Sequence, residues 1–318
     1  MSRAVVTGCA GFIGSHLTEK LLSQGWSVIG IDCLSPTYDT TRRRRVLDEI
    51  AADRDFEFIE GDIVQIDPRP LLEGADVVFH LAARPGVRAS WSDFRVAADA
   101  NILATQRLLD ALADRPGIRL VFASSSSVYG SAESFPTYED TPLAPISPYG
   151  VTKAACEALV GAYAAQTGLD VASLRYFTVY GPRQRSDMAF TKWISHALRS
   201  EPLPVYGDGS TVRDFTYVDD VVNASIACAS CELEGHEVFN VAGGSPATLN
   251  DVLDLLSELV DTRIKVEYMD RERGDPDRTG GDTTKLRNAT GWHPSWTLAE
   301  GLALQVSWLR GVLGRPLK

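Results

Sequence analysis

Val5-Val6-Thr7-Gly8-Cys9-Ala10-Gly11-Phe12-Ile13-Gly14, near the start of the chain, places three glycines between a β-branched run and an amphipathic stretch. The run predicts a strand over residues 4–7, and the stretch predicts a helix over residues 12–24. Gly8 suits a tight turn, Gly11 lets a pyrophosphate approach the backbone, and Gly14 allows the helix to pack closely on the strand. The free N–H groups at the start of that helix attract anions. We therefore predict a strand–turn–helix unit that binds a dinucleotide.

An acidic residue stands at the end of the next predicted strand, residues 27–32. Asp32 follows Gly14 by 18 residues, and from that position a carboxylate accepts hydrogen bonds from ribose hydroxyls. A carboxylate there repels a 2′-phosphate, so NAD is favoured over NADP. Further cofactor contacts are expected where the third and fourth strands end, at residues 62–63 and 80–83, although ordinary packing at strand ends is the alternative.

Short β-branched runs alternate with amphipathic stretches through the first half of the chain, which predicts a parallel sheet covered by helices on both faces. The expected strands are 4–7, 27–32, 56–60, 77–81, 120–124 and 171–176, with a later strand over 237–241 that returns to the sheet. The expected helices are 12–24, 40–51, 97–113, 149–166, 249–260 and 298–309. We predict an α/β fold with a Rossmann-type doubly wound parallel sheet of about seven strands. Residues 1–176, with the strand at 237–241, would form the NAD-binding domain, and residues 177–318 would mainly form a smaller α/β substrate-binding lobe.

The composition is that of an acidic globular chain. Of its 318 residues, 44% are hydrophobic and 23% are charged, and the formal net charge of -11 disfavours nucleic acid and anionic membranes as partners. No apolar run approaches the roughly 20 residues of a membrane span, and the N-terminus does not resemble a signal peptide, so we expect a cytoplasmic protein.

Neither the cysteines nor the histidines form a recognisable site. The five residues of each type are dispersed, so no disulfide framework and no metal site are expected. Cys228 and Cys231 have CxxC spacing and are interpreted as buried helix residues. The charge run at residues 42–45 is interpreted as a solvated helix face, with binding of a cofactor phosphate as the alternative.

Tyr149 and Lys153 form a candidate acid–base pair. Residues four apart lie on the same face of a helix, and Ser147 and Pro148 suit the N-cap and the first helical position. A nearby ammonium lowers the pKa of a phenol from its usual value of about 10. The spacing also occurs by chance on solvated helices. A catalytic role for the pair is favoured by the serines at 124–127, which follow the fifth predicted strand at the edge of the sheet where ligands bind.

These segments together resemble the extended short-chain dehydrogenase/reductase family, the NAD-dependent nucleotide-sugar epimerases and dehydratases, across essentially the whole chain. The matching segments are 7–14, 80–83, 125–130, 149–153, 213–215 and 217–220. The resemblance implies that Tyr149 is the base, that Ser125 orients the sugar 4-hydroxyl, and that Lys153 contacts the nicotinamide ribose. It also implies a homodimer formed through the helices at 97–113 and 149–166. The expected NAD contacts are Gly8, Gly11, Phe12, Ile13, Gly14, Asp32, Asp62, Ile63, Leu81, Ala82, Ala83, Tyr149, Lys153 and Tyr176.

Within that family, the two residues after Ser125 separate the chemistries. Sugar 4,6-dehydratases carry Asp-Glu there, and UDP-glucuronate decarboxylases typically carry Glu at the second position. This chain has Ser126 and Ser127, which leaves 4-epimerisation as the simplest chemistry. The stretch at 175–189 is similar to the segment FTVYGP…RPDMA of UDP-glucuronate 4-epimerases, with Ser186 where those usually have Pro, and residues 85–90 are similar to the same group.

The resemblance implies that Thr178 and Arg185 hold the carboxylate of a hexuronate, since a guanidinium matches two carboxylate oxygens. For Arg185, a surface ion pair is the alternative. Arg88 and Arg213 are expected to bind the diphosphate, and Asp275, within Arg273-Gly274-Asp275, is a candidate ribose contact. The expected substrate-binding residues are Gly86, Arg88, Ser125, Ser126, Thr178, Arg185, Arg213 and Asp275.

The reaction implied by the resemblance is NAD-dependent 4-epimerisation of a UDP-hexuronate, from UDP-glucuronate to UDP-galacturonate, through a transient 4-keto sugar. Two alternatives lie within the same enzyme class, a 4-epimerase of a neutral UDP-hexose and a UDP-glucuronate decarboxylase. A third alternative is a non-catalytic dinucleotide-binding sensor. Such sensors commonly lack the tyrosine or the lysine, and this chain has both.

Overall fold

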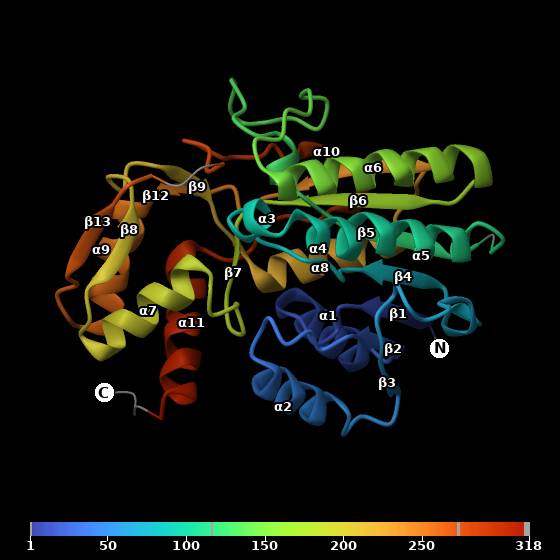
Figure 1. Ribbon diagram of the computed structural model, residues 1–318, viewed down its shortest axis with the longest axis horizontal. Helices are drawn as coiled ribbons and strands as arrows, with labels where there is room; N and C mark the ends of the chain where they lie inside the picture. The colour runs from blue at the N-terminus through green and yellow to red at the C-terminus, as the bar shows by residue number, and fades with distance from the viewer. Residues whose placement is uncertain (1, 116, 272–273, 315–318) are drawn as a thin grey trace.

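The computed structural model describes residues 2–115, 117–271 and 274–314. A large α/β part carries a smaller lobe at its side (Figure 1). Its central sheet is parallel, with the strand order β11-β6-β5-β4-β1-β2-β3. The order reverses between β1 and β4, and in open α/β sheets ligands bind in the crevice at such a reversal. The strands are β1 (Arg3–Thr7), β2 (Ser27–Asp32), β3 (Phe56–Glu60), β4 (Val77–His80), β5 (Arg119–Ser125), β6 (Val171–Tyr176) and β11 (His236–Val241).

Helices cover both faces of the sheet because the strands are apolar on both sides. Along β1, Ala4 and Val6 pack in one buried cluster with α1 and α8, and Val5 packs in a second with α5 and α6, as the two-residue period of a strand requires. The helices of this part are α1 (Phe12–Ser23), α2 (Thr40–Ile50), α3 (Ala89–Ser92), α4 (Phe94–Ala98), α5 (Ala104–Leu112), α6 (Pro148–Thr167) and α8 (Val218–Ser230), with short turns η1 (Arg69–Leu72), η2 (Asp99–Leu103) and η3 (Ser126–Val128).

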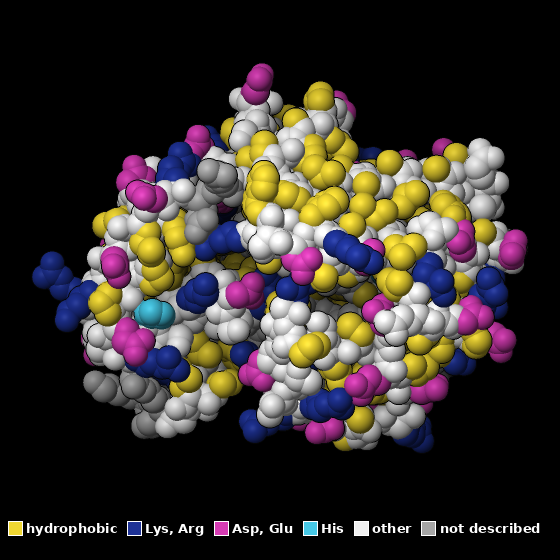
Figure 2. All heavy atoms as spheres, viewed as in Figure 1, with side chains coloured by type: hydrophobic (Ala, Val, Ile, Leu, Met, Phe, Trp, Pro, Cys, Tyr) yellow, Lys and Arg dark blue, Asp and Glu magenta, His cyan; other side chains and the backbone are white. Residues whose placement is uncertain are grey.

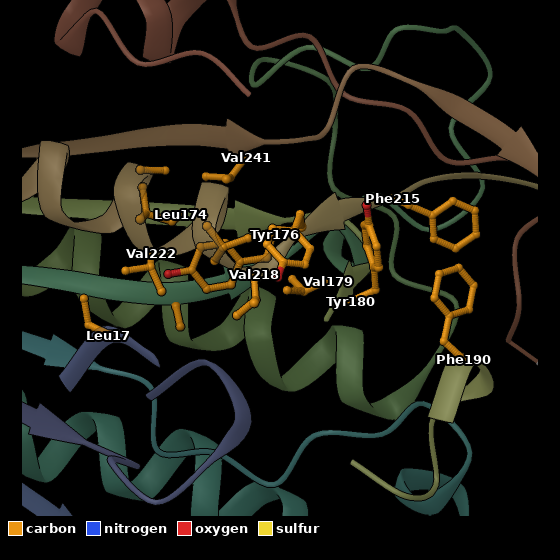
Figure 3. Close-up of a cluster of buried hydrophobic side chains, with 14 of the residues drawn as sticks. Leu17, Leu174, Tyr176, Val179, Tyr180, Phe190, Phe215, Val218, Val222 and Val241 are labelled. Atoms are coloured by element: carbon orange, nitrogen blue, oxygen red, sulfur yellow. The ribbon is translucent and has the colours of Figure 1, made fainter. Parts of the chain in front are cut away.

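The smaller lobe consists of helices and three two-stranded sheets, β10-β7, β12-β9 and β13-β8. Its elements are β7 (Val179–Tyr180), α7 (Ala189–Arg199), β8 (Leu203–Tyr206), β9 (Val212–Asp214), β10 (Thr216–Tyr217), β12 (Pro246–Thr248), α9 (Leu249–Val260), β13 (Val266–Met269) and α11 (Leu298–Val312). Helix α10 (Thr284–Thr290) lies instead against β11 of the central sheet (Figure 1). Aromatic side chains join the smaller lobe to the sheet (Figure 3). Tyr180 packs on Phe190 with ring centroids 5.4 Å apart, and Phe190 packs on Phe215 at 4.8 Å. This packing fixes the segment that follows Tyr180.

The seven strands predicted for the sheet are all present, and their ends lie within one residue of the expected positions. The helix predicted over 97–113 is present as a continuous helical run over 94–112, but a π-helical turn, η2, lies within it between α4 and α5. Asn101 lies in that turn and is buried. Its side chain accepts a hydrogen bond from the N–H of Arg84 at 2.7 Å and donates one to Thr152 at 2.9 Å. These tertiary contacts, which have no helical period, hold the turn in place.

None of the helices within the described ranges combines the length and the hydropathy that crossing a membrane requires.

Candidate active site

A cavity at the carboxyl edge of the sheet brings together the glycine-rich turn, the ends of several strands and the first turns of α6. Its walls include every residue predicted to contact NAD, together with one predicted substrate residue, Arg185. These wall residues are Gly8, Gly11, Phe12, Ile13, Gly14, Asp32, Asp62, Ile63, Leu81, Ala82, Ala83, Tyr149, Lys153, Tyr176 and Arg185.

The glycine-rich turn has the geometry that a dinucleotide pyrophosphate needs. Gly8 has a φ of +74°, and a Cβ on Gly14 would lie 2.1 Å from the carbonyl oxygen of Gly8, so neither position tolerates a side chain. Helix α1 begins at the N-cap Gly11, which has no side chain to bond the N–H groups of the first turn. Those N–H groups therefore stay available for an anion. The residues present thus fit NAD.

Asp32 is buried and hydrogen-bonded to the backbone. Its carboxylate accepts from the N–H of Ala10 at 3.1 Å and from the N–H of Leu34 at 2.9 Å. It also forms an ion pair with Arg43. Arg43 therefore shares the carboxylate that was expected to receive the ribose hydroxyls.

The charge run at 42–45 is only partly the solvated face that was predicted. Arg44 and Arg45 are exposed, but Arg42 and Arg43 line the cavity. The guanidinium carbon of Arg42 lies 3.9 Å from the centroid of the Trp308 ring of α11. The prediction is wrong for these two residues, because α2 turns one face toward the cleft between the sheet and the C-terminal lobe.

The start of α6 follows the sequence prediction. The Ser147 hydroxyl accepts a hydrogen bond from the N–H of Gly150 at 3.1 Å, and Pro148 occupies the first helical position. The backbone N–H of Tyr149 donates to the Ser90 hydroxyl at 3.0 Å. These contacts set the direction of the first turn, so that Tyr149 and Lys153 both reach the cavity.

Burial raises the pKa of the Tyr149 phenol, while a hydrogen bond with Ser125 and the charge of Arg185 lower it. Lys153 was expected to be the cation that stabilises the phenolate. Its ammonium instead donates to the carbonyl oxygen of Ala123 at 2.7 Å, and burial lowers its pKa. Ser125 and Arg185 are the groups that lower the pKa of Tyr149, and the expected contact of Ser125 with the sugar 4-hydroxyl stays a prediction.

A buried ion pair lies behind the catalytic helix. Arg175 on β6 and Glu157 on α6 approach to 2.7 Å, and each side chain is 5% exposed. Glu157 also accepts a hydrogen bond from Ser124, and Arg175 donates to the Tyr129 hydroxyl at 2.7 Å. The pair therefore joins α6 to the two strands whose ends carry Ser125 and Tyr176.

Arg185 forms a two-point ion pair with Asp187, in which Nε and Nη2 donate at 2.9 and 3.0 Å. The ion pair that the sequence left as an alternative is therefore present, but Arg185 also lines the cavity and acts on Tyr149. The expected contact of Arg185 with a hexuronate carboxylate stays a prediction.

The other predicted substrate residues lie outside the walls of this cavity. Arg213 is bound to Asp275 at 2.6 Å, so these two expected contacts of the nucleotide hold each other. Arg88 lies over the Tyr206 ring of β8 at 3.9 Å. Thr178 stands between β6 and β7, and Arg273 falls outside the described residues. Gly86, Ser125 and Ser126 complete the set of predicted substrate residues that lie outside the cavity walls.

The chain is similar to a known protein family over most of its length. Residues 4–242 match the model of the NAD dependent epimerase/dehydratase family. The chain belongs to this family. Its relatives include a UDP-glucuronate 4-epimerase of Thermodesulfobacterium geofontis, 38% identical over 97% of this chain and 96% of that protein. An uncharacterised UDP-glucose epimerase of Bacillus subtilis, YtcB, is 40% identical over 96% of this chain and 98% of that protein.

A solved structure of a family member has nearly the same fold. UDP-glucuronic acid 4-epimerase from Bacillus cereus, in complex with UDP-glucuronic acid and NAD, superposes with a TM-score of 0.94. The two chains are 36% identical, and the match covers 98% of this chain and 99% of that one. NAD is accordingly the cofactor of this family member, in agreement with the glycine-rich turn and Asp32.

Two residues that line the epimerase/dehydratase cleft were not predicted, Tyr38 of the loop after β2 and Arg183. Arg183 also binds Glu19 of α1 at 2.7 and 2.8 Å. No local pattern marks Tyr38 or Arg183. Arg42 and Arg43, which also line the cavity, were included in the sequence analysis only through the alternative of a phosphate-binding run at 42–45.

Proposed function

We propose that this family member is a UDP-glucuronate 4-epimerase, which interconverts UDP-glucuronate and UDP-galacturonate. The observation that carries the proposal is the position of Arg185, which lines the same cavity as Tyr149 and whose charge lowers the pKa of that phenol. A cation beside the base that addresses C4 would meet the carboxylate on C6 of a uronate. A neutral hexose offers that cation no charged partner.

Tyr149 takes the proton of the sugar 4-hydroxyl, and Ser125 holds the same oxygen by hydrogen bonding. NAD, when bound, supplies the acceptor and later the donor of the hydride at C4. Lys153, 3% exposed, would contact the ribose of the nicotinamide half of NAD. The 4-keto sugar then rotates about its link to the UDP, which stays bound, and presents its opposite face. Tyr149 returns the proton to the oxygen.

Retention of the C6 carboxylate is the demanding part of this reaction. A 4-keto uronate is a β-keto acid, and it loses CO₂ when the breaking bond lies parallel to the π orbitals of the carbonyl. We infer that Arg185 and Thr178 hold the carboxylate away from that alignment, so that binding geometry suppresses the side reaction. Ser126 and Ser127 provide no acid or base for elimination.

The test of this proposal is conversion of UDP-glucuronate by the purified protein, with and without added NAD⁺, followed by the anomeric protons in NMR. Appearance of UDP-galacturonate is expected. A 4-keto pentose would indicate decarboxylation instead. Conversion of UDP-glucose but not of UDP-glucuronate would support the neutral-hexose alternative, and an unchanged spectrum with every UDP-sugar would favour a sensor.

We further propose that two copies associate through α3, α4, η2 and α6. Large apolar side chains are exposed there, including Trp91 at 54%, Phe94 at 47% and Val151 at 44%. They border a groove with Pro145, Ile146 and Pro148, and Figure 2 shows hydrophobic side chains gathered over this face. Exposed apolar patches of this kind favour protein interfaces. A second copy would present the same patch, as a two-fold dimer requires.

Light scattering after size-exclusion chromatography tests the dimer. Val151→Glu is expected to yield a monomer, because it introduces a charge into the apolar groove. Tyr268→Glu, at a residue 57% exposed on β13, is the matched control and should leave the dimer intact. A monomeric parent protein would contradict the proposal. The cytoplasmic location expected from the sequence stays a prediction.

A further inference from the structure

The guanidinium of Arg185 has five N–H groups, of which Asp187 uses two. Nε donates to one carboxylate oxygen of Asp187 at 2.9 Å, and Nη2 donates to the other at 3.0 Å. This pairing occupies the side edge of the guanidinium. The end edge, with one N–H group of Nη1 and the second of Nη2, remains for another acceptor. A carboxylate can bind that edge through both of its oxygens.

Hydrogen bonds of the buried neighbour Gln184 hold the backbone that carries Arg185. Gln184 is 2% exposed, and its side-chain oxygen accepts from the N–H of Thr191 at 3.1 Å and from Gln305 of α11 at 2.9 Å. Its amide group donates to the carbonyl oxygen of Val179 at 3.1 Å. The Cα position of Arg185 is therefore fixed by α7 and α11, and contacts of its own side chain decide where the guanidinium points.

An aromatic ring lies against the same guanidinium. The guanidinium carbon of Arg185 is 5.4 Å from the centroid of the Tyr38 ring, within the range of a cation–π contact. The Tyr38 hydroxyl donates to the carbonyl oxygen of Pro85 at 3.3 Å, which ties the ring to the segment after β4. Tyr38 thus restricts the plane of Arg185, and Asp187 fixes its rotation within that plane.

We propose that Asp187 is a positioning residue that aims the end edge of Arg185 at the sugar carboxylate, and thereby sets the preference for a uronate over a neutral sugar. The proposal rests on the proposed function, because it assigns a role within the same site. Asp187 itself is not among the residues that line the cofactor cavity. Its effect on the substrate passes through Arg185.

A purely structural role for Asp187 would give a different result. The Asp187 side chain is 53% exposed, and ion pairs with a partner this exposed contribute little to folding stability. Removal of the charge should therefore leave thermal unfolding nearly unchanged. It should allow the guanidinium of Arg185 to rotate, which weakens recognition of a carboxylate and leaves recognition of the UDP group intact.

The test compares the binding of UDP-glucuronate and UDP-glucose to the NAD-loaded protein by calorimetry. In the parent protein we expect UDP-glucuronate to bind more tightly. In Asp187→Asn that preference should fall about tenfold, which corresponds to the loss of one charge-assisted contact. Asp187→Glu, which keeps a carboxylate, should recover part of the preference.

Asp67→Asn is the matched control, because Asp67 also pairs with an arginine two residues away, Arg69, and is 56% exposed. It should leave the preference for the uronate unchanged. An equal preference in Asp187→Asn and in the parent protein would overturn the proposal. So would a parent protein with no preference for the uronate.

Turnover distinguishes failure of this inference from failure of the proposed function. A parent protein that prefers UDP-glucuronate in binding but converts none of it would refute the epimerase assignment, while the binding ratio would still decide the role of Asp187. If the parent protein converts UDP-glucuronate, Asp187→Asn should raise KM for it more than it lowers kcat. It should also release a larger fraction of 4-keto pentose, because the carboxylate is held less firmly.

Discussion

Replacement of Glu157 by glutamine tests how the catalytic helix is held. Glu157 and Arg175 form an ion pair at 2.7 Å with both side chains 5% exposed. The substitution keeps the size of the side chain and one acceptor oxygen, but it leaves the guanidinium of Arg175 buried without a counter-charge. Loss of one partner of a buried pair costs about 3–5 kcal/mol.

The expected change in melting temperature follows from the size of the chain. The entropy of unfolding is about 2.1 cal/mol/K for each residue, or roughly 0.7 kcal/mol/K for 318 residues. A loss of about 3–5 kcal/mol then lowers the melting temperature by about 4–7 °C. Thermal unfolding followed by circular dichroism, at one fixed NAD concentration, measures this shift.

Glu60→Gln is the matched control. Glu60 pairs with Arg44 at 3.1 Å, but the two side chains are 50% and 54% exposed. An exposed pair contributes about 0–1 kcal/mol, so the melting temperature should change by less than about 2 °C. If Glu157→Gln and Glu60→Gln shifted the melting temperature equally, the reasoning that burial makes the Glu157 pair costly to break would be refuted.

Three further changes have defined outcomes. Arg185→Gln removes a charge that lowers the pKa of Tyr149, so the rise of kcat/KM with pH should move to higher pH; an unmoved profile would argue against the contact. Gly14→Ala would place a Cβ 2.1 Å from the carbonyl oxygen of Gly8 and should weaken NAD binding at least about tenfold by titration, whereas Gly311→Ala, with open space around it, should not. Burial raises the pKa of Asp214 to about 6, above its unfolded value of about 3.9, so its ionisation destabilises the fold as the pH rises from about 4 through 6. In urea unfolding, Asp214→Asn should therefore gain about 3 kcal/mol relative to the parent protein between pH 4 and 7, and a constant difference would contradict this.

The sequence predicted those parts of the fold whose signals are local. The β-branched runs marked the strands, and Ser147 with Pro148 marked the start of α6. The π-helical turn between α4 and α5 could not be predicted, because it depends on contacts of Asn101 with Arg84 and Thr152. A regular apolar period says nothing of such distant partners.

The candidate site divides in the same way. Glycines and strand ends fix the backbone at this edge of the sheet, and the residues expected to contact NAD all line one cavity. The partners of the charged side chains could not be predicted in this way, because each of these side chains pairs with a residue of another element. Asp32 binds Arg43 of α2, and Lys153 donates to Ala123 rather than acting on Tyr149. The spacing of residues in the sequence does not reveal either of these contacts.

Transfer of the hydrogen at C4 tests the central claim most directly. UDP-glucuronate carrying deuterium at C4 would be converted in ordinary water, and the product would be examined by NMR and mass spectrometry. We predict UDP-galacturonate that keeps the deuterium at C4. Tyr149 exchanges only the proton on oxygen, whereas the carbon-bound hydrogen leaves and returns within one site. Loss of the deuterium to solvent would contradict this prediction.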